Sequence, residues 1–150
     1  AGQTLRLHLG ELARERCADR LGAELPAAAD LREFDAVGGL TLGADPVATA
    51  MLHAASKRGR TLDAFVVRKA EKAHGLQRRI EGPDVVGRKV LAVEDTSTTG
   101  GSVMTAVEAL REAGATVVAV AVIVDRGAGA LIEEAGLPYL AAYSLADLGL

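Results

Sequence analysis

The chain has 150 residues, a length typical of one domain with a substantial core. Its composition, 49% hydrophobic and 25% charged, is that of a globular protein rather than a disordered one. Aromatic residues make up only 3% and the formal net charge is −3, which argues against base-stacking platforms and against general attraction to DNA or acidic membranes. The single cysteine, Cys17, excludes an internal disulfide and a cysteine-based metal cluster. Since no apolar run approaches the ~20 residues of a membrane span, we expect one cytoplasmic domain over residues 1–150, with neither nucleic acid nor membrane as a partner.

The first third of the chain predicts two helices and a short strand. Residues 4–24 have an amphipathic pattern, with Cys17 as a small packing residue on the apolar face. A strand at residues 34–39 ends in two glycines. The helix that follows is expected to have Asp45 as its N-cap and Pro46 at its first position.

A basic segment interrupts the middle of the chain. A second strand, at residues 62–67, runs directly into a polar stretch of about a dozen residues, 68–79. This stretch has no apolar face wide enough to bury, which is typical of a mobile loop or a solvated flap.

Three further strands are predicted at residues 89–93, 116–124 and 137–143. Helical patterns separate them, and Ser144 with Asp147 predicts a capping box on a final helical turn. Strands that alternate with helices indicate an α/β fold, with a mainly parallel five-stranded sheet flanked by helices.

Unusual chemistry follows four of these strands. In a parallel sheet the carboxyl ends of the strands meet at one edge, and ligands bind there. The segments at this edge are 38–44, 68–79, 94–102 and 125–127. Their convergence is the main sequence argument for a functional site.

The stretch after the strand at 89–93 has the composition of a phosphate-binding loop. Small hydroxyls, glycines and a helix start suit a phosphate monoester, because backbone N–H groups and the helix dipole favour an anion. Glu94 and Asp95 would repel that phosphate directly, so we expect them to bind sugar hydroxyls or to hold Mg²⁺ through water. The alternative is an ordinary strand-to-helix turn with Thr99 as N-cap.

Cations on two other segments could meet an anionic substrate. Arg68, Lys69 and Lys72 could neutralise a polyphosphate, and His74 could donate a hydrogen bond or carry a proton. The alternative is a solvated charge run. Arg126 could bind a carboxylate or phosphate through two hydrogen bonds, or it could form an ion pair with Asp125 or a neighbouring helix.

Together these motifs resemble the type I phosphoribosyltransferases, and among them the orotate phosphoribosyltransferase family in its actinobacterial form. The resemblance covers roughly residues 34–150. It rests on Val90–Ser102, which is similar to the phosphoribosyl-pyrophosphate signature, on the Arg-Lys-x-x-Lys-x-His order that begins at Arg68, on Ile80-Glu81-Gly82, and on Val124-Asp125-Arg126.

The resemblance implies transfer of a 5-phosphoribosyl group from phosphoribosyl pyrophosphate to orotate, which yields orotidine 5′-monophosphate and pyrophosphate. It implies that the loop at 38–44 meets the pyrophosphate and that Thr98 and Arg126 hold orotate. Mg²⁺ would travel with the diphosphate, without a direct protein ligand. The implied catalytic residues are Lys72, His74 and Asp95. The residues implied to bind phosphoribosyl pyrophosphate are Arg68, Lys69, Lys72, His74, Glu94, Asp95, Thr96, Ser97, Thr98, Thr99, Gly100, Gly101 and Ser102.

The same resemblance implies a homodimer in which the basic flap crosses to the neighbouring subunit, so that Lys72 and His74 serve the partner's site. Two alternatives stay open: a purine-type phosphoribosyltransferase, and a non-catalytic regulator that senses phosphoribosyl pyrophosphate. The chain also departs from the family pattern. Leu42 and Gly43 occupy positions where the family often has Tyr and Lys. Residues 1–33 contain no match to the family's N-terminal hood, so the domain is expected to have that segment incomplete or absent.

Overall fold

The computed structural model describes residues 34–69 and 79–150. Three predictions lie outside the described residues. They concern the helix at 4–24 with Cys17, the N-terminal hood expected to be incomplete or absent within residues 1–33, and the flap residues Lys72 and His74.

One six-stranded sheet forms the centre of the molecule, with the order β3-β2-β1-β4-β5-β6. Its strands are β1 (Ala36–Leu40), β2 (Asp63–Val67), β3 (Ile80–Glu81), β4 (Lys89–Ser97), β5 (Thr116–Asp125) and β6 (Tyr139–Ser144). All neighbouring pairs are parallel except β2 and β3. The predicted α/β fold and mainly parallel sheet are confirmed. The sixth strand, β3, was not predicted, because two residues are too few to show a strand pattern.

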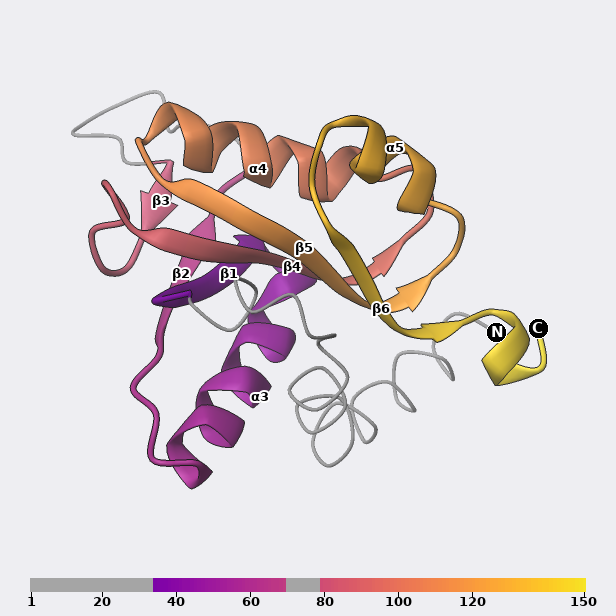
Figure 1. Ribbon diagram of the computed structural model, residues 1–150, viewed down its shortest axis with the longest axis horizontal. Coiled ribbons are helices and arrows are strands. Elements are labelled where there is room, and N and C mark those ends of the chain that lie inside the picture. The colour runs from indigo at the N-terminus through magenta and orange to yellow at the C-terminus, as the bar shows by residue number, and fades with distance from the viewer. Residues whose placement is uncertain (1–33, 70–78) are drawn as a thin grey trace.

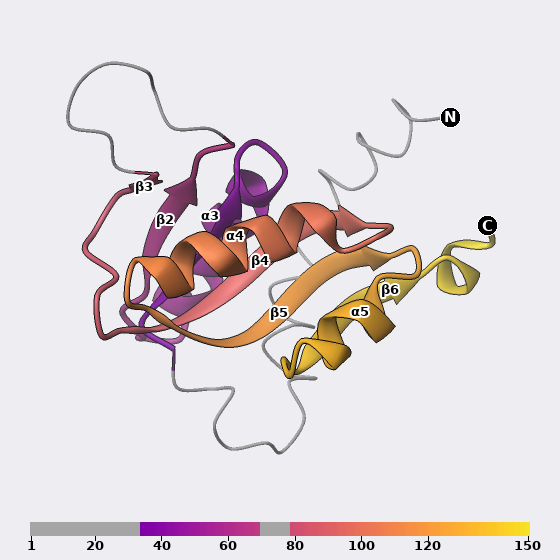
Figure 2. The ribbon, with the colours of Figure 1, turned by 90° about the horizontal axis from the view of Figure 1, so that it is seen from above.

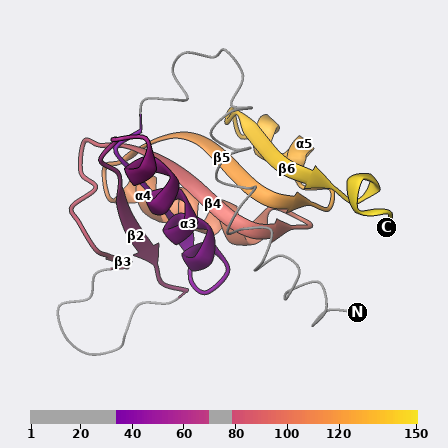
Figure 3. The same ribbon diagram turned by 90° about the horizontal axis from the view of Figure 1, so that it is seen from below.

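Helices cover both faces of this sheet (Figure 1). On one face α3 (Ala44–Lys57) packs against β1, β2 and β4 (Figure 3). On the other face lie α4 (Gly101–Glu112) and α5 (Gly129–Glu134), with α5 beside β6 (Figure 2). A short 3-10 helix, η3 (Ala146–Leu148), follows β6. None of the helices in the described residues has the length and apolar character needed to cross a membrane.

Alternating side chains of the central strands fill two separate cores. In β4, Val90 and Ala92 belong to the core beneath α4, whereas Leu91 and Val93 belong to the core beneath α3. Successive side chains of a strand point to opposite faces, so a strand buried on both faces must be apolar at nearly every position. This requirement explains the continuous apolar run that the sequence shows in β5.

Two predicted helix starts differ from the structure. The helix after β1 begins at Ala44 with Gly43 as N-cap, so the prediction of Asp45 as N-cap is wrong. The Asp45 carboxylate instead accepts a hydrogen bond from Thr41 Oγ1 at 3.0 Å. The N-cap of α4 is Gly100, with φ of 77°, rather than Thr99.

The predicted capping box at the end of the chain is present. The Ser144 N–H donates to Asp147 Oδ2 at 2.8 Å, and the Asp147 N–H donates to Ser144 Oγ at 3.2 Å. Each residue therefore satisfies a backbone donor of the other.

The order of the strands reverses between β1 and β4. From β1 the chain passes through α3 to β2 on one side, and from β4 it passes through α4 to β5 on the other. In open parallel sheets, a crevice for ligands forms outside the carboxyl ends of the strands at such a reversal. The fold thus predicts a ligand site at the loops that follow β1 and β4.

Candidate active site

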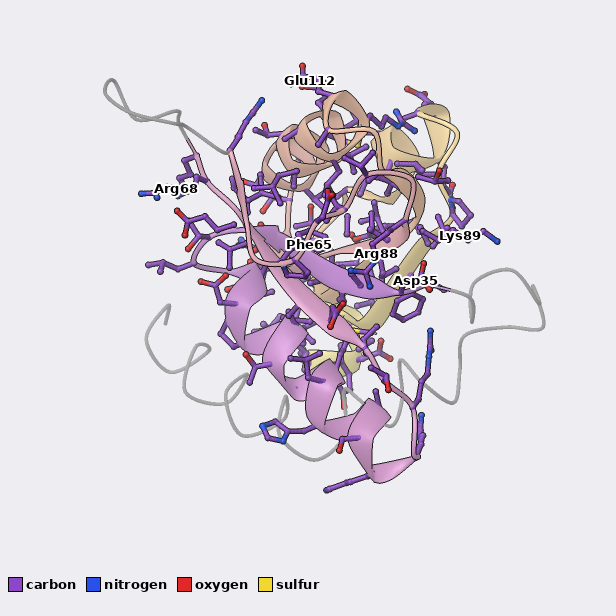
Figure 4. The ribbon with its side chains drawn as sticks, turned by 90° about the vertical axis from the view of Figure 1, so that its left-hand side faces the viewer. Asp35, Phe65, Arg68, Arg88, Lys89 and Glu112 are labelled. Carbon is purple, nitrogen blue, oxygen red and sulfur yellow. The ribbon has the colours of Figure 1, made fainter. Side chains whose placement is uncertain are left out.

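The structure brings the described parts of the four predicted segments to the same edge of the sheet, with residues 68, 69 and 79 representing the basic segment. The last residues of neighbouring strands are paired, Leu40 with Val67 and Ser97 with Asp125. Figure 4 shows Arg68 at this edge and Arg88 at the opposite edge. At that opposite edge Arg88 donates to the Asp35 carbonyl oxygen at 2.9 Å, so this arginine stabilises the far side of the sheet.

Glu94 is a buried carboxyl group at the end of β4, with 6% of its surface exposed. Burial raises the pKa of Glu94 to about 7, and the Asp95 carboxyl group adds to this shift, whereas the hydrogen bond from the Asp95 N–H and the charge of Lys69 oppose it. Glu94 Oε1 accepts the Asp95 N–H at 3.1 Å, and Asp95 Oδ1 accepts the Thr96 N–H at 2.7 Å. Near neutral pH, Glu94 can therefore donate as well as accept hydrogen bonds, which suits sugar hydroxyls.

The loop between β1 and α3 lies directly against these two carboxyl groups. A Cβ atom on Gly43 would lie 2.0 Å from Glu94 Oε1 and 2.8 Å from Asp95 Oδ1. Hydrogen bonds hold the loop in place, since the Thr41 N–H donates to the Val67 carbonyl oxygen at 2.9 Å. A side chain at position 43 would therefore displace the carboxyl groups of Glu94 and Asp95. The predicted pyrophosphate loop and the acidic pair thus form one continuous surface.

The start of α4 offers an anion-binding end. No acidic residue stands in its first turn, so the positive end of the helix dipole is not neutralised by the helix's own side chains. Thr98, Thr99, Gly101 and Ser102 are exposed there, and the Gly101 N–H donates to Thr99 Oγ1 at 3.4 Å. Exposed amides and hydroxyls at a helix start suit a phosphate group.

Arg68 is held at the end of β2. Its N–H donates to the Arg79 carbonyl oxygen at 2.9 Å, and its guanidinium forms an ion pair with Glu81 on β3. The sequence did not assign a role to Glu81. A prediction that β3 pairs with β2 would have placed it near Arg68. Lys69 is exposed beside Arg68. The structure therefore places two of the four predicted cations of this segment at the active-site edge.

Arg126 follows β5 and lies next to the phosphate loop. Its N–H donates to the Ser97 carbonyl oxygen at 2.8 Å, which ties it to the residue before Thr98. Asp125 does not pair with it. Instead, although partial burial acts the other way, hydrogen bonds from the Gly127 and Ala128 N–H groups and from the Tyr139 hydroxyl lower the pKa of Asp125. The exposed Arg126 side chain and Thr98 thus share one side of the site.

The donors at the site are compatible with Mg²⁺ only in part. Within residues 34–69 and 79–150 no three His, Cys, Asp or Glu side chains are grouped as metal ligands. Glu94 and Asp95 supply hard oxygen atoms of the kind that Mg²⁺ prefers. The remaining oxygen atoms would have to come from the substrate and from water.

A sheet edge that combines an exposed helix start, an acidic pair and flanking cations agrees with the phosphoribosyltransferase site that the sequence led us to expect. The family model for the phosphoribosyl transferase domain matches residues 11–136 of the chain. The orotate phosphoribosyltransferase of Streptomyces coelicolor is 71% identical over 129 residues, which are 84% of this chain and 70% of that protein. That of Corynebacterium glutamicum is 58% identical over 144 residues, or 95% of this chain and 70% of the relative. The chain belongs to the orotate phosphoribosyltransferase family.

Solved structures agree with this assignment. Mycobacterium tuberculosis orotate phosphoribosyltransferase is 57% identical, with a TM-score of 0.76 over 89% of this chain and 74% of that one. The same enzyme in complex with 5-phospho-alpha-D-ribosyl 1-diphosphate is 52% identical over the same shares of the two chains, with a TM-score of 0.72. A phosphoribosyltransferase from Corynebacterium diphtheriae is 50% identical, with a TM-score of 0.74 over 96% of this chain and 98% of that one.

Proposed function

We propose that the protein transfers the 5-phosphoribosyl group from phosphoribosyl pyrophosphate to orotate, which yields orotidine 5′-monophosphate and pyrophosphate in pyrimidine biosynthesis. One observation carries this proposal. At the paired carboxyl ends of β4 and β5, an exposed helix start, a pair of carboxyl groups and the exposed Arg126 lie side by side. The names of the relatives favour orotate over a purine base and favour an enzyme over a regulator.

The end of β4 and the start of α4 would bind the ribose 5-phosphate half of the substrate. Thr96–Ser102 would surround the 5′-phosphate with amides and hydroxyls, because the dipole of α4 favours its charge. Glu94 and Asp95 would bind the ribose hydroxyls. These contacts hold the sugar carbon that reacts close to the incoming base.

Displacement of pyrophosphate builds positive charge on the sugar and negative charge on the leaving group. Arg68, Lys69, Lys72 and His74 would stabilise the leaving pyrophosphate, with Lys72, His74 and Asp95 as the catalytic residues. Bound Mg²⁺ neutralises charge on the diphosphate, and Glu94 and Asp95 would hold it through water. The reaction requires no covalent nucleophile from the protein.

Orotate would lie between Thr98 and Arg126. Its carboxylate matches the guanidinium of Arg126, which can donate two parallel hydrogen bonds to a carboxylate. Purine bases lack this carboxylate, so Arg126 would select orotate over them.

The proposal includes a homodimer that acts in the cytoplasm. Lys72 and His74 would reach the site of the partner subunit, so each site would combine residues of two chains. One cysteine in 150 residues is compatible with a reducing compartment.

The direct test is loss of orotate absorbance with phosphoribosyl pyrophosphate and Mg²⁺. We expect turnover by the wild type, and a roughly tenfold or greater rise in the KM for orotate in Arg126→Ala, since a charge-assisted contact is lost. The KM for phosphoribosyl pyrophosphate should change little. Faster turnover of adenine, guanine or xanthine would contradict the proposal in favour of a purine enzyme. Ligand binding without turnover of any base would indicate a regulator.

A further inference from the structure

Asp125, the last residue of β5, receives three hydrogen bonds on one oxygen atom. Its Oδ1 accepts the Gly127 N–H at 2.9 Å, the Ala128 N–H at 3.0 Å and the Tyr139 hydroxyl at 3.0 Å. The two amide bonds shape the turn that leads from β5 into α5. The third bond comes from another strand, so it anchors this turn to the rest of the fold.

The ring of Tyr139 is positioned by packing rather than by its hydroxyl alone. It packs against the core beneath α4 and α5. It also lies on Gly129, where an added Cβ would be 3.2 Å and 3.3 Å from two ring atoms. Burial and the bond to Asp125 raise the pKa of Tyr139, so the hydroxyl remains a donor at all physiological pH values. A larger residue at 129 would push the ring away from Asp125.

Arg126 lies between Asp125 and Gly127, which are joined to each other by a hydrogen bond. Its own N–H is bonded to the Ser97 carbonyl oxygen, and the next residue, Gly127, has φ of 113°, which a side chain would disfavour. Its guanidinium is exposed and has no ion pair with a described residue. The backbone of Arg126 is therefore held on both sides while its charged group remains available.

We propose that Tyr139 is a positioning residue for orotate: through Asp125 it holds the turn that presents Arg126 beside Thr98. This inference rests on the proposed function, because it assumes that Arg126 binds the carboxylate of orotate. It assigns Tyr139 no contact with either substrate.

Of the described residues proposed to bind phosphoribosyl pyrophosphate, Arg68 and Lys69 follow β2, and Glu94 and Asp95 lie in β4 before the residues that meet this turn. Ser97 meets the turn through its backbone carbonyl oxygen, which accepts the Arg126 N–H. The effect of Tyr139 should therefore be larger on the KM for orotate than on the KM for phosphoribosyl pyrophosphate.

The test is Tyr139→Phe, which keeps the ring and removes the hydroxyl. Loss of one hydrogen bond corresponds to a rise of roughly three- to tenfold in the KM for orotate, with the KM for phosphoribosyl pyrophosphate and the melting temperature nearly unchanged. In an Arg126→Ala background the same substitution should have no further effect on the KM for orotate, because the two residues act in series. Tyr143→Phe is the matched control. It is the same change on the same strand, but its ring packs against the opposite core, and the KM for orotate should not change.

Three results would overturn the inference: equal rises in both KM values, a lower melting temperature without a change in KM, or an undiminished effect in the Arg126→Ala background. If Arg126→Ala raises the KM for orotate and Tyr139→Phe does not, the inference fails and the proposed function stands. If the wild type does not consume orotate, the proposed function fails as well.

Discussion

At the scale of single residues, the burial of Glu94 couples the stability of the protein to pH. The unfolded chain releases the Glu94 proton near the ordinary pKa of 4.5, whereas the folded chain keeps it until about pH 7. Between these values the folded state binds more protons, so the free energy of unfolding falls as pH rises, by about 3 kcal/mol for this group. Glu94→Gln has no proton to release. We expect its free energy of unfolding, measured with urea at several pH values, to lack this decrease.

A matched control for this measurement is Glu108→Gln, because Glu108 is exposed on α4. This variant should follow the pH dependence of the wild type. A Glu94→Gln variant that loses stability between pH 5 and pH 7 as the wild type does would show that Glu94 is ionised throughout this range.

Local sequence was sufficient to predict some of these residues and not others. The acidic pair and the hydroxyl-rich loop are contiguous in sequence, so their chemistry could be recognised without knowledge of the fold. The pairs Arg68–Glu81 and Asp125–Tyr139 join different strands, and the register that brings them together is set by the whole sheet. Such partners cannot be predicted from any single segment of the sequence.

At the scale of elements, β1 and its loop contain glycines with two different functions. A Cβ on Gly39 would lie 2.2 Å from the Val93 carbonyl oxygen, which belongs to the backbone and cannot move aside. We expect Gly39→Ala to lower the free energy of unfolding by about 2 kcal/mol through overpacking. The three atoms nearest to a Cβ on Gly43 all belong to the carboxyl groups of Glu94 and Asp95, which can rotate away.

Gly43→Ala should therefore keep most of the stability but displace Glu94 and Asp95 from the sugar site. We expect a roughly tenfold or greater rise in the KM for phosphoribosyl pyrophosphate, because small misplacements of binding groups have large effects. Urea denaturation and steady-state kinetics on both variants give the comparison. An unchanged KM for Gly43→Ala, or a loss of stability equal to that of Gly39→Ala, would contradict the assignment of separate functions.

The elements themselves were predictable to different degrees. The apolar runs of β4 and β5 indicated strands buried on both faces, because short runs rich in valine and bounded by glycine and polar residues fit a strand better than a helix. The start of α3 was misplaced because Asp-Pro is a strong start signal, whereas the structure uses Asp45 to hold Thr41. β3 is a strand because its two residues pair with β2, and this pairing cannot be recognised from the sequence of β3 itself.

At the scale of the whole molecule, the sheet places the proposed binding groups on one edge, and the proposed function adds Lys72 and His74 to them. Strand order, handedness and the reversal between β1 and β4 bring the phosphate loop, the acidic pair and Arg126 together. The Arg68 N–H donates to the Arg79 carbonyl oxygen, which ties the residue after β2 to the residue before β3 at this edge. The proposal that Lys72 and His74 serve the partner's site in a homodimer can be tested by mixing variants.

If Lys72 and His74 serve the partner, two inactive variants should restore each other's activity. The variant Lys72→Ala/His74→Ala lacks the flap cations, and Asp95→Asn lacks a group of the sugar site. In a mixed dimer, one site then combines the intact sugar site of the first chain with the intact flap of the second. Mixed dimers form half of a random mixture and each has one complete site, so about a quarter of wild-type activity should return after subunit exchange. If the flap acts within its own chain, every site keeps one defect and the mixture stays inactive; light scattering that shows a monomer at assay concentration would contradict the shared site directly.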